Sequence, residues 1–282
     1  AVHARLDLLN GLEAATVLAS LARMGVRDER AVAPVGACLL DRAPDCEVKH
    51  LVVAARAYGK LGLAGQRGPC RGDEVFGVAV QAAMDHPESL DCAHLTMMAA
   101  ACASVTGEDH AIAKGCLTKL QPRIQEVIRD MSPEQMASIA QSMARMQLPA
   151  SEAFGLIAQR AIAMDTVPPY AALRMASAWG TLQLQDPALV RVLCNSALNH
   201  LEVLDLSQLL PFIFSLSQMS SQCSRSQQTV ATLLKTAAST LARRSPQSWH
   251  DLAAVAKPYA RFRVSDSRLF GHLLRHTVAM LE

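Results

Sequence analysis

Apolar residues recur along this chain at helical spacing, and the pattern returns every 36 to 44 residues. In each of seven units one residue closes an apolar helical stretch, and this residue is the anchor of its unit. The anchors are Met24, Leu61, Val105, Met146, Leu182, Met219 and Phe262. A period of this length is typical of helical-repeat proteins, in which each repeat is a pair of helices.

The residues in front of the anchors form columns of constant character. Three positions before the anchor the residue is large or soft: Leu21, Tyr58, Cys102, Met143, Trp179, Leu216 and Tyr259. The next residue is always small: Ala22, Gly59, Ala103, Ala144, Gly180, Ser217 and Ala260. A third column, six positions before the anchor, is apolar: Leu18, Ala55, Ala99, Ala140, Ala176, Ile213 and Ala256. Together the columns predict a helix whose packing edge lets a neighbouring helix approach closely.

A second helix is predicted behind each anchor. Helix-capping residues follow the anchors in six units: Asp28, Asp109, Ser151, Asp186, Ser224 and Asp266. Amphipathic stretches then run over Glu152–Met164, Pro187–Leu201 and Ser267–Leu281. Since a lone helical hairpin cannot bury both faces, the units must stack on one another. We predict an all-α, right-handed α-solenoid of about seven helix-turn-helix repeats, forming a single domain over residues 1–282 without strands.

Two segments interrupt the period. The stretch Gly62–Gly72 is too rich in glycine and proline for a helix, so it predicts an inserted loop at about 62–72. Gln121–Met131 is expected to lengthen a helix before a restart at Ser132-Pro133-Glu134. The triplet Ser245-Pro246-Gln247 predicts the same kind of restart, with proline at the first helical position.

Composition agrees with a helical solenoid. The 282 residues are 51% hydrophobic but only 4% aromatic, which suits a large core of Ala, Leu, Val and Met. Apolar runs stay well short of the roughly 20 residues that span a bilayer, so we expect a soluble protein without membrane insertion. The eight cysteines include no Cys-x-x-Cys pair. We interpret them as free thiols of a reducing compartment, because cysteine on an apolar helix face behaves as a small hydrophobe.

Three stretches carry a family resemblance: Ser132–Gln147, Val167–Leu193 and Ser245–Leu274. They resemble repeats of the octotricopeptide and heptatricopeptide type, and are similar to the helical region of FAST-kinase-domain and RAP-domain proteins. The resemblance implies an organellar protein, mitochondrial or, as second choice, plastid, that binds RNA. No α/β module of the RAP type is recognised after Glu282, so no nuclease activity is implied.

The charges are balanced overall but placed regularly. The formal net charge is only +2, with 27 Lys and Arg against 25 Asp and Glu, which is not typical of a strongly basic nucleic-acid binder. Cations nevertheless stand directly before four anchors and one turn earlier in two units. These predicted RNA-binding residues are Arg23, Arg56, Lys60, Arg145, Lys257 and Arg261. A second interpretation needs no ligand, because a cation in the last turn of a helix also complements the helix dipole.

Chemical motifs for catalysis or metal binding are poor. His272 and His276 are four residues apart, but HLLRH lacks the glutamate of the zinc-protease motif. The loop sequence GQRGPCRG lacks the ending of a phosphate-binding loop and follows no strand. We therefore expect no enzymatic activity, no catalytic residues, no metal, no cofactor and no small-molecule substrate.

Two functions stay open at this point. The first is an RNA-binding component or factor of an organellar ribonucleoprotein, in particular the mitochondrial ribosome, in contact with ribosomal or other organellar RNA and with neighbouring proteins. The second is a protein–protein scaffold or accessory subunit of an organellar complex that makes no RNA contact. The low net charge favours the scaffold, whereas the basic column and the repeat type favour RNA.

Overall fold

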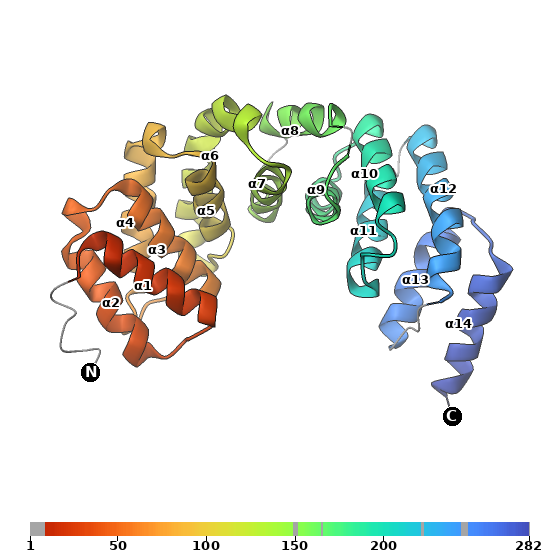
Figure 1. Cartoon of the computed structure of the whole chain (residues 1–282), viewed down its shortest axis with the longest axis horizontal. Coiled ribbons are helices and arrows are strands. Elements are labelled where there is room, and N and C mark those ends of the chain that lie inside the picture. Colours follow the sequence, from red (N-terminus) through yellow and green to blue (C-terminus); the bar gives the residue numbers. More distant parts are fainter. Residues whose placement is uncertain (1–8, 149–151, 165, 221–222, 244–247, 282) are drawn as a thin grey trace. The chain divides into compact units, whose positions relative to one another are not determined.

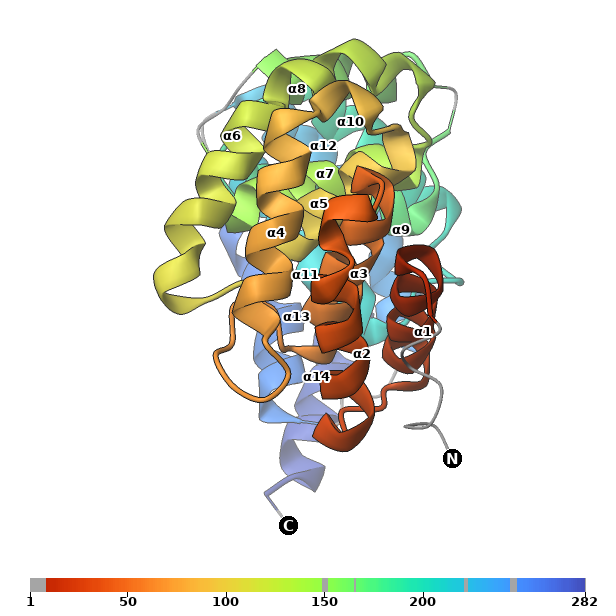
Figure 2. The same cartoon turned by 90° about the vertical axis from the view of Figure 1, so that its left-hand side faces the viewer.

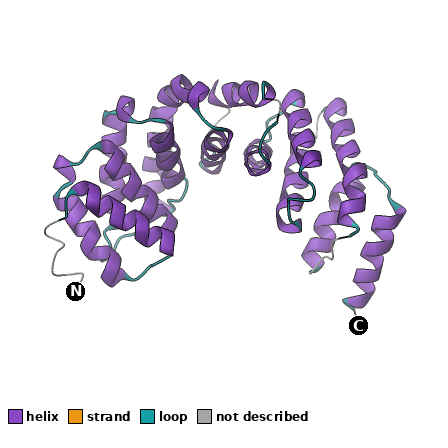
Figure 3. Cartoon of the chain, viewed as in Figure 1, coloured by secondary structure: helices purple, strands orange, loops and turns teal. Residues whose placement is uncertain are grey.

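The computed structural model describes residues 9–148, 152–164, 166–220, 223–243 and 248–281. This part of the chain contains fourteen α-helices, four short 3-10 helices and no strand (Figure 3). The prediction of an all-α protein is therefore confirmed for the described residues. Contacts divide the chain into two compact units, Ala1–Ala153 and Phe154–Glu282. The single continuous solenoid over residues 1–282 stays a prediction.

Each unit is a succession of helical hairpins (Figure 1). Unit 1 holds α1 (Gly11–Met24), α2 (Glu29–Asp41), α3 (Val48–Leu61), α4 (Gly72–Asp85), α5 (Cys92–Cys102), α6 (His110–Val127) and α7 (Pro133–Arg145). The helix α8 (Glu152–Ile162) begins before the boundary between the units and ends beyond it. Unit 2 holds α9 (Pro169–Thr181), α10 (Pro187–Asn199), α11 (Leu206–Met219), α12 (Ser224–Leu241), α13 (Trp249–Arg261) and α14 (Ser267–Ala279).

Within each unit the helices form two rows. In unit 1, α1 packs on α3, α3 on α5 and α5 on α7, while α2 packs on α4 and α4 on α6 (Figure 1 and Figure 2). In unit 2, α9 packs on α11 and α11 on α13, while α10 packs on α12 and α12 on α14. The odd row of a unit is therefore built from the predicted first helices, and the even row from the second helices.

Four predicted caps are present at the helix starts. Asp28, Asp186 and Asp266 each accept a hydrogen bond from a backbone amide in the first turn of the helix that follows. Ser132 caps α7 in a reciprocal pair with Gln135. Such caps satisfy amides that have no partner inside the helix.

Two predicted caps turn out differently, and two others lie outside the described residues. Asp109 precedes α6 but makes no capping bond with its side chain. The prediction for Ser224 was wrong, because the helix already includes it and Cys223 is the N-cap. Ser248 caps α13, two residues beyond the predicted first helical position, Pro246. Ser151 and Ser245-Pro246-Gln247 lie outside the described residues.

A left-handed residue directly after the anchor ends five of the seven odd-row helices. These residues are Gly25, Gly62, Gln147, Gln183 and Arg263, with φ between 49° and 74°. In each case the next amide donates to the carbonyl of the large residue three before the anchor, at 2.9 to 3.1 Å. This is the Schellman ending of a helix, and the donors are the apolar residues Val26, Leu63, Leu148, Leu184 and Val264. This helix ending is not among the features predicted from the sequence.

The packing columns agree with the structure. The large column is buried in every unit except at Leu21, and the apolar column is buried except at Ala256. At the small column, a Cβ on Gly59 would collide with the Ser104 hydroxyl, and one on Gly180 would lie 3.2 Å from the Cα of Ser215 on α11. The small residues therefore permit close approach of the next odd helix, as predicted at these two positions.

The inserted loop is present and anchored. Residues 62–71 separate α3 from α4, and the buried Tyr58 hydroxyl donates to the Cys70 carbonyl at 2.8 Å. The corresponding tyrosine of unit 2, Tyr259, donates to the Leu234 carbonyl at 2.6 Å. Burial raises the pKa of both tyrosines well above the ordinary value.

All eight cysteines are free thiols, and Cys102, Cys116 and Cys194 are buried on helix faces as expected. Cys38 is only partly buried. Burial raises the pKa of Cys194 to about 12. Because thiolates are the reactive form, this thiol behaves as a core side chain. None of the helices in the described residues is long and apolar enough to cross a membrane.

Candidate nucleic-acid interface

The six cations predicted from the sequence all lie on odd-row helices. Four stand in the last helical turn: Arg23 on α1, Lys60 on α3, Arg145 on α7 and Arg261 on α13. Arg56 and Lys257 stand one turn earlier on α3 and α13. All are exposed except Arg56, which is half-buried. The four last-turn cations each stand one residue before the anchor of their repeat. Because the helices end at the same point of each repeat, these side chains point in the same direction from their helices.

The structure does not bring all six into one cluster. Unit 1 holds Arg23, Arg56, Lys60 and Arg145, while unit 2 holds Lys257 and Arg261 on α13 alone. In unit 1, α5 interrupts the row of cations, since Ala100 and Ser104 occupy the corresponding positions. Each unit is therefore a separate candidate surface.

Within the described part of the chain, five of these cations have no neighbouring carboxylate. Among the described residues no acidic side chain lies within 4.0 Å of the charged groups of Arg23, Lys60, Arg145, Lys257 or Arg261. Other cations are paired, including Arg123 with Glu126 at 2.9 Å and Arg243 with Glu202 at 2.8 Å. Cations that are regularly placed and not neutralised produce a positive electrostatic potential, which attracts an anionic chain.

On α13 the two cations are held against α11. The Arg261 guanidinium donates from Nη1 to the Ser217 hydroxyl at 3.4 Å. The Lys257 ammonium lies over the Phe214 ring, 5.8 Å from its centroid, within the range of a cation–π contact. Neither contact neutralises the charge, so both groups remain available to an anion.

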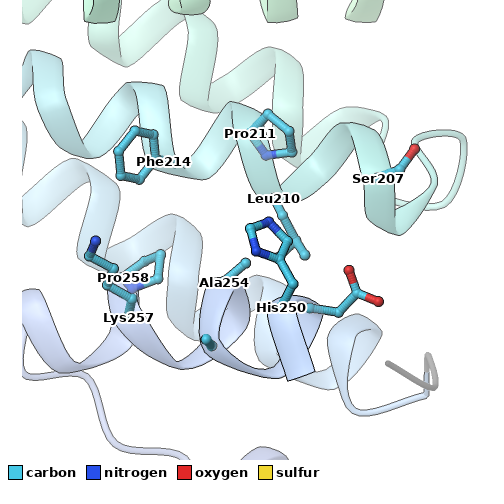
Figure 4. A pocket seen from close by; sticks show the side chains of 10 residues that line it. Ser207, Leu210, Pro211, Phe214, His250, Ala254, Lys257 and Pro258 are labelled. Carbon is cyan, nitrogen blue, oxygen red and sulfur yellow. The ribbon is translucent and has the colours of Figure 1, made fainter. Parts of the chain in front are cut away.

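A groove runs between α11 and α13 in unit 2 (Figure 4). Its volume is about 610 Å³. The lining includes Leu210, Pro211 and Phe214 on α11, and His250, Ala254 and Lys257 on α13. Figure 4 shows Phe214 and Lys257 on opposite sides of the groove, with His250 pointing from α13 toward Pro211. The groove is therefore mainly apolar along its length and carries a cation opposite the ring.

Three exposed ring side chains of unit 2, Tyr170, Phe214 and His250, are not among the site residues predicted from the sequence. Phe214 is 44% exposed and lies five residues before its anchor, the position that Arg56 and Lys257 occupy in their units. Tyr170 and His250 are exposed at twelve residues before their anchors. The column five residues before the anchor, which holds Arg56 and Lys257, also contains Phe214, but only charge was sought in it.

The position of the last-turn cations serves two interpretations equally. A cation at the carboxyl end of a helix gains about 0.3 to 1 kcal/mol from the helix dipole without any ligand. Only the exposed aromatic residues and the groove are unexplained by the helix dipole.

Histidine and cysteine residues do not assemble into a recognisable centre. The rings of His272 and His276 meet edge to face at 4.5 Å between centroids. The imidazole of His94 lies 2.8 Å from the Asp91 carboxylate, which also caps α5. In the described part of the chain no group of three or more potential metal ligands is found.

Comparison with models of protein families gives no match, and comparison with curated proteins gives none either. Function is therefore inferred from the residues themselves and from the repeat resemblance.

Proposed function

We propose that this protein binds single-stranded RNA along the odd-row helices of its two units. The observation that carries the proposal is the set of exposed cations in the last turns of α1, α3, α7 and α13, none of which has an acidic partner among the described residues. Cations of this kind gain from phosphate contact, because binding releases the counterions condensed on the RNA.

The distribution of cations fits a backbone contact rather than a base code. One cation per helix end gives at most a few phosphate contacts per unit, and columns this irregular cannot read one base per repeat. The modest net charge of +2 fits a protein that meets RNA along a narrow surface and meets other proteins elsewhere.

The larger setting of the proposal comes from the repeat resemblance. The resemblance implies that the hairpins of both units are about seven repeats of one right-handed α-solenoid. The protein acts as a structural component or factor of an organellar ribonucleoprotein, most simply the mitochondrial ribosome, with a plastid particle as second choice. The odd-to-odd and even-to-even packing inside each unit supports this repeat architecture.

Salt dependence of RNA binding tests the proposal. Replacing Arg23, Lys60, Arg145 and Arg261 together by glutamine should flatten the dependence of log K on log salt by roughly 2.8 units, at about 0.7 per phosphate contact. The matched control replaces Arg30 on α2 and Arg160 on α8, two exposed arginines outside the odd row, and should leave the slope unchanged. If the cations only stabilise helix ends, the slope stays constant and the melting temperature alone falls slightly.

Crosslinking provides an independent readout of the same surface. Photo-crosslinked RNA should map, at peptide level, to α1, α3, α7 and α13 and not to α2, α4, α10 or α12. Wild-type protein without any salt-sensitive affinity for single-stranded RNA, alone or in its native particle, would remove the proposal.

A protein scaffold is the second candidate, and one observation favours it. The last helix exposes Leu274 and Val278 at 64% and 48%, and a groove of about 380 Å³ between α13 and α14 is lined by Trp249 and Phe270. Apolar side chains exposed in this number are typical of a protein contact. In this alternative the odd-row cations serve the helix ends only.

A further inference from the structure

The groove of unit 2 has a composition that phosphate binding alone does not require. A strand held only by its backbone needs cations, yet this groove presents the face of Phe214 and the ring of Pro211 beside Lys257 (Figure 4). The Lys257 ammonium lies 5.8 Å from the centroid of the Phe214 ring. An aromatic ring left 44% exposed between two helices costs free energy in water unless something covers it.

We infer that this groove holds an unpaired base of single-stranded RNA, stacked on Phe214, with the adjoining phosphates on Lys257 and Arg261. The inference rests on the proposed function and assigns a role to residues that the cation columns did not include. Single-stranded nucleic acids are commonly bound by a cationic surface interleaved with aromatic residues, because every base has a flat face that can stack.

The charges in the groove, Lys257 and Asp251, and the neighbouring Arg261 set the direction of the nucleotide. Lys257 and Arg261 are one turn apart, about 6 Å along the axis of α13, and both lie toward its carboxyl end. Asp251, the acidic residue among the lining side chains, is six residues before Lys257, about 9 Å along the same axis. The phosphates therefore lie at the carboxyl end of α13, and the neutral base lies along Phe214 and Pro211.

The contact between Lys257 and Phe214 suits an exchange when RNA arrives. An exposed cation–π contact is weaker than the stacking of a base on an aromatic ring, so the base can take the place of the ammonium. The lysine side chain is long and flexible, and its ammonium then pairs with a phosphate. An apolar peptide in the groove would cover the ring equally well but would leave both cations without an anion.

The test uses the full chain and two probes of equal charge, a short oligouridylate and an abasic ribose–phosphate strand of the same length. Wild-type protein should bind the oligouridylate more tightly. Phe214→Leu, which keeps apolar bulk but removes the ring, should weaken oligouridylate binding by about 5-fold or more and leave the abasic strand unaffected. Phe214→Trp should retain or improve binding. Because neither variant changes charge, the salt slope should stay constant, whereas Lys257→Gln should lower it by about 0.7.

Phe270→Leu on α14 is the matched control, since Phe270 is an exposed phenylalanine of the even row. It should change neither affinity. Equal binding of the two strands, or Phe214→Leu binding oligouridylate like wild type, overturns the inference while the salt slope still supports the proposed function. A tryptophan variant as weak as the leucine variant also overturns it. Absence of any salt-dependent binding in the wild type overturns both.

Discussion

The odd rows of the two units present different surfaces built on the same positions. In unit 1, the position five residues before the anchor holds Arg56 on α3 and Ala100 on α5, and the row is cationic without exposed aromatic rings at that position. In unit 2 the same position holds Phe214 on α11 and Lys257 on α13, and a groove lies between those helices. One helical framework therefore supports a plain cationic surface in one unit and an aromatic, grooved surface in the other.

A position in the repeat therefore determines where a side chain points but not what it contacts. The neighbouring odd helix decides whether a residue meets solvent, a partner side chain or a groove wall. Lys257 contacts Phe214 only because α11 packs beside α13. RNA binding and stability should accordingly respond differently in the two units when cations, packing residues or aromatic rings are replaced.

The largest expected effect is on RNA binding. Changing Arg23, Lys60 and Arg145 in unit 1 to glutamine should lower the salt slope by about 2.1, and changing Lys257 and Arg261 in unit 2 should lower it by about 1.4, at about 0.7 per contact. Fluorescence anisotropy with oligouridylate over a salt series measures both. With a base stacked in unit 2, the second variant should retain the preference for oligouridylate over the abasic strand. Loss of slope in only one of the two variants would confine RNA to that unit.

The next effect concerns helix packing. Gly180→Leu and Ala144→Leu should each overpack the core and cost about 1 to 3 kcal/mol or more, seen as a lower melting temperature. Gly180→Ala should be more harmful than Gly59→Ala, because Gly180 faces backbone and Cβ atoms of Ser215, whereas Gly59 faces a serine hydroxyl that can rotate away. Leucine variants that melt like wild type would show that the small column does not lie at the packing edge.

A smaller effect compares the two buried tyrosines. Tyr58→Phe and Tyr259→Phe each remove a hydrogen bond to a backbone carbonyl and should cost about 1 kcal/mol. Only Tyr58 holds the inserted loop, so Tyr58→Phe should also speed trypsin cleavage after Arg67 and Arg71. Equal protease sensitivity of the two variants would contradict the anchoring role of Tyr58.

The same tyrosines predict alkaline sensitivity. Burial raises the pKa of each in the folded state, so above the ordinary pKa of 10.0 the unfolded chain loses protons that the folded chain keeps. The contribution of each tyrosine to the free energy of unfolding is therefore fully present below about pH 10. Above that pH it declines by about 1.4 kcal/mol per pH unit for each tyrosine. Denaturant titrations between pH 9 and 11 should show a shallower decline in either phenylalanine variant.

The smallest effect lies at a helix end. Gln183 has φ of 54°, a conformation that costs a residue with a side chain more than it costs glycine. Gln183→Gly should raise stability by a few tenths of a kcal/mol, since relief of strain exceeds the added freedom of the unfolded chain. Gln185→Gly, outside this conformation, is the control and should stabilise nothing. If Gln183→Gly lowered the stability, the glutamine side chain would stabilise the fold by more than its left-handed backbone conformation destabilises it.

Much of the fold could be predicted from the sequence because the interactions that determine it are local. Caps such as Asp28 and Ser132 act within one turn, and the large and small columns lie one helical turn apart, so their spacing alone predicts helices with a buried edge. The six cations were found for the same reason, since each stands at a fixed offset from an anchor. The Schellman endings also had a signal, a glycine or polar residue followed by Val or Leu, as in Gly25-Val26 and Gln183-Leu184.

Local sequence patterns alone predict that this protein is helical, where several of its helices begin and which faces they bury. Tertiary structure alone decided which cations share a row, that Phe214 faces Lys257, and that a groove opens between α11 and α13. Such relations join residues about 40 positions apart, so they depend on how one odd helix packs against the next. Local spacing sets the direction of a side chain, but only the neighbouring helix supplies what that side chain meets.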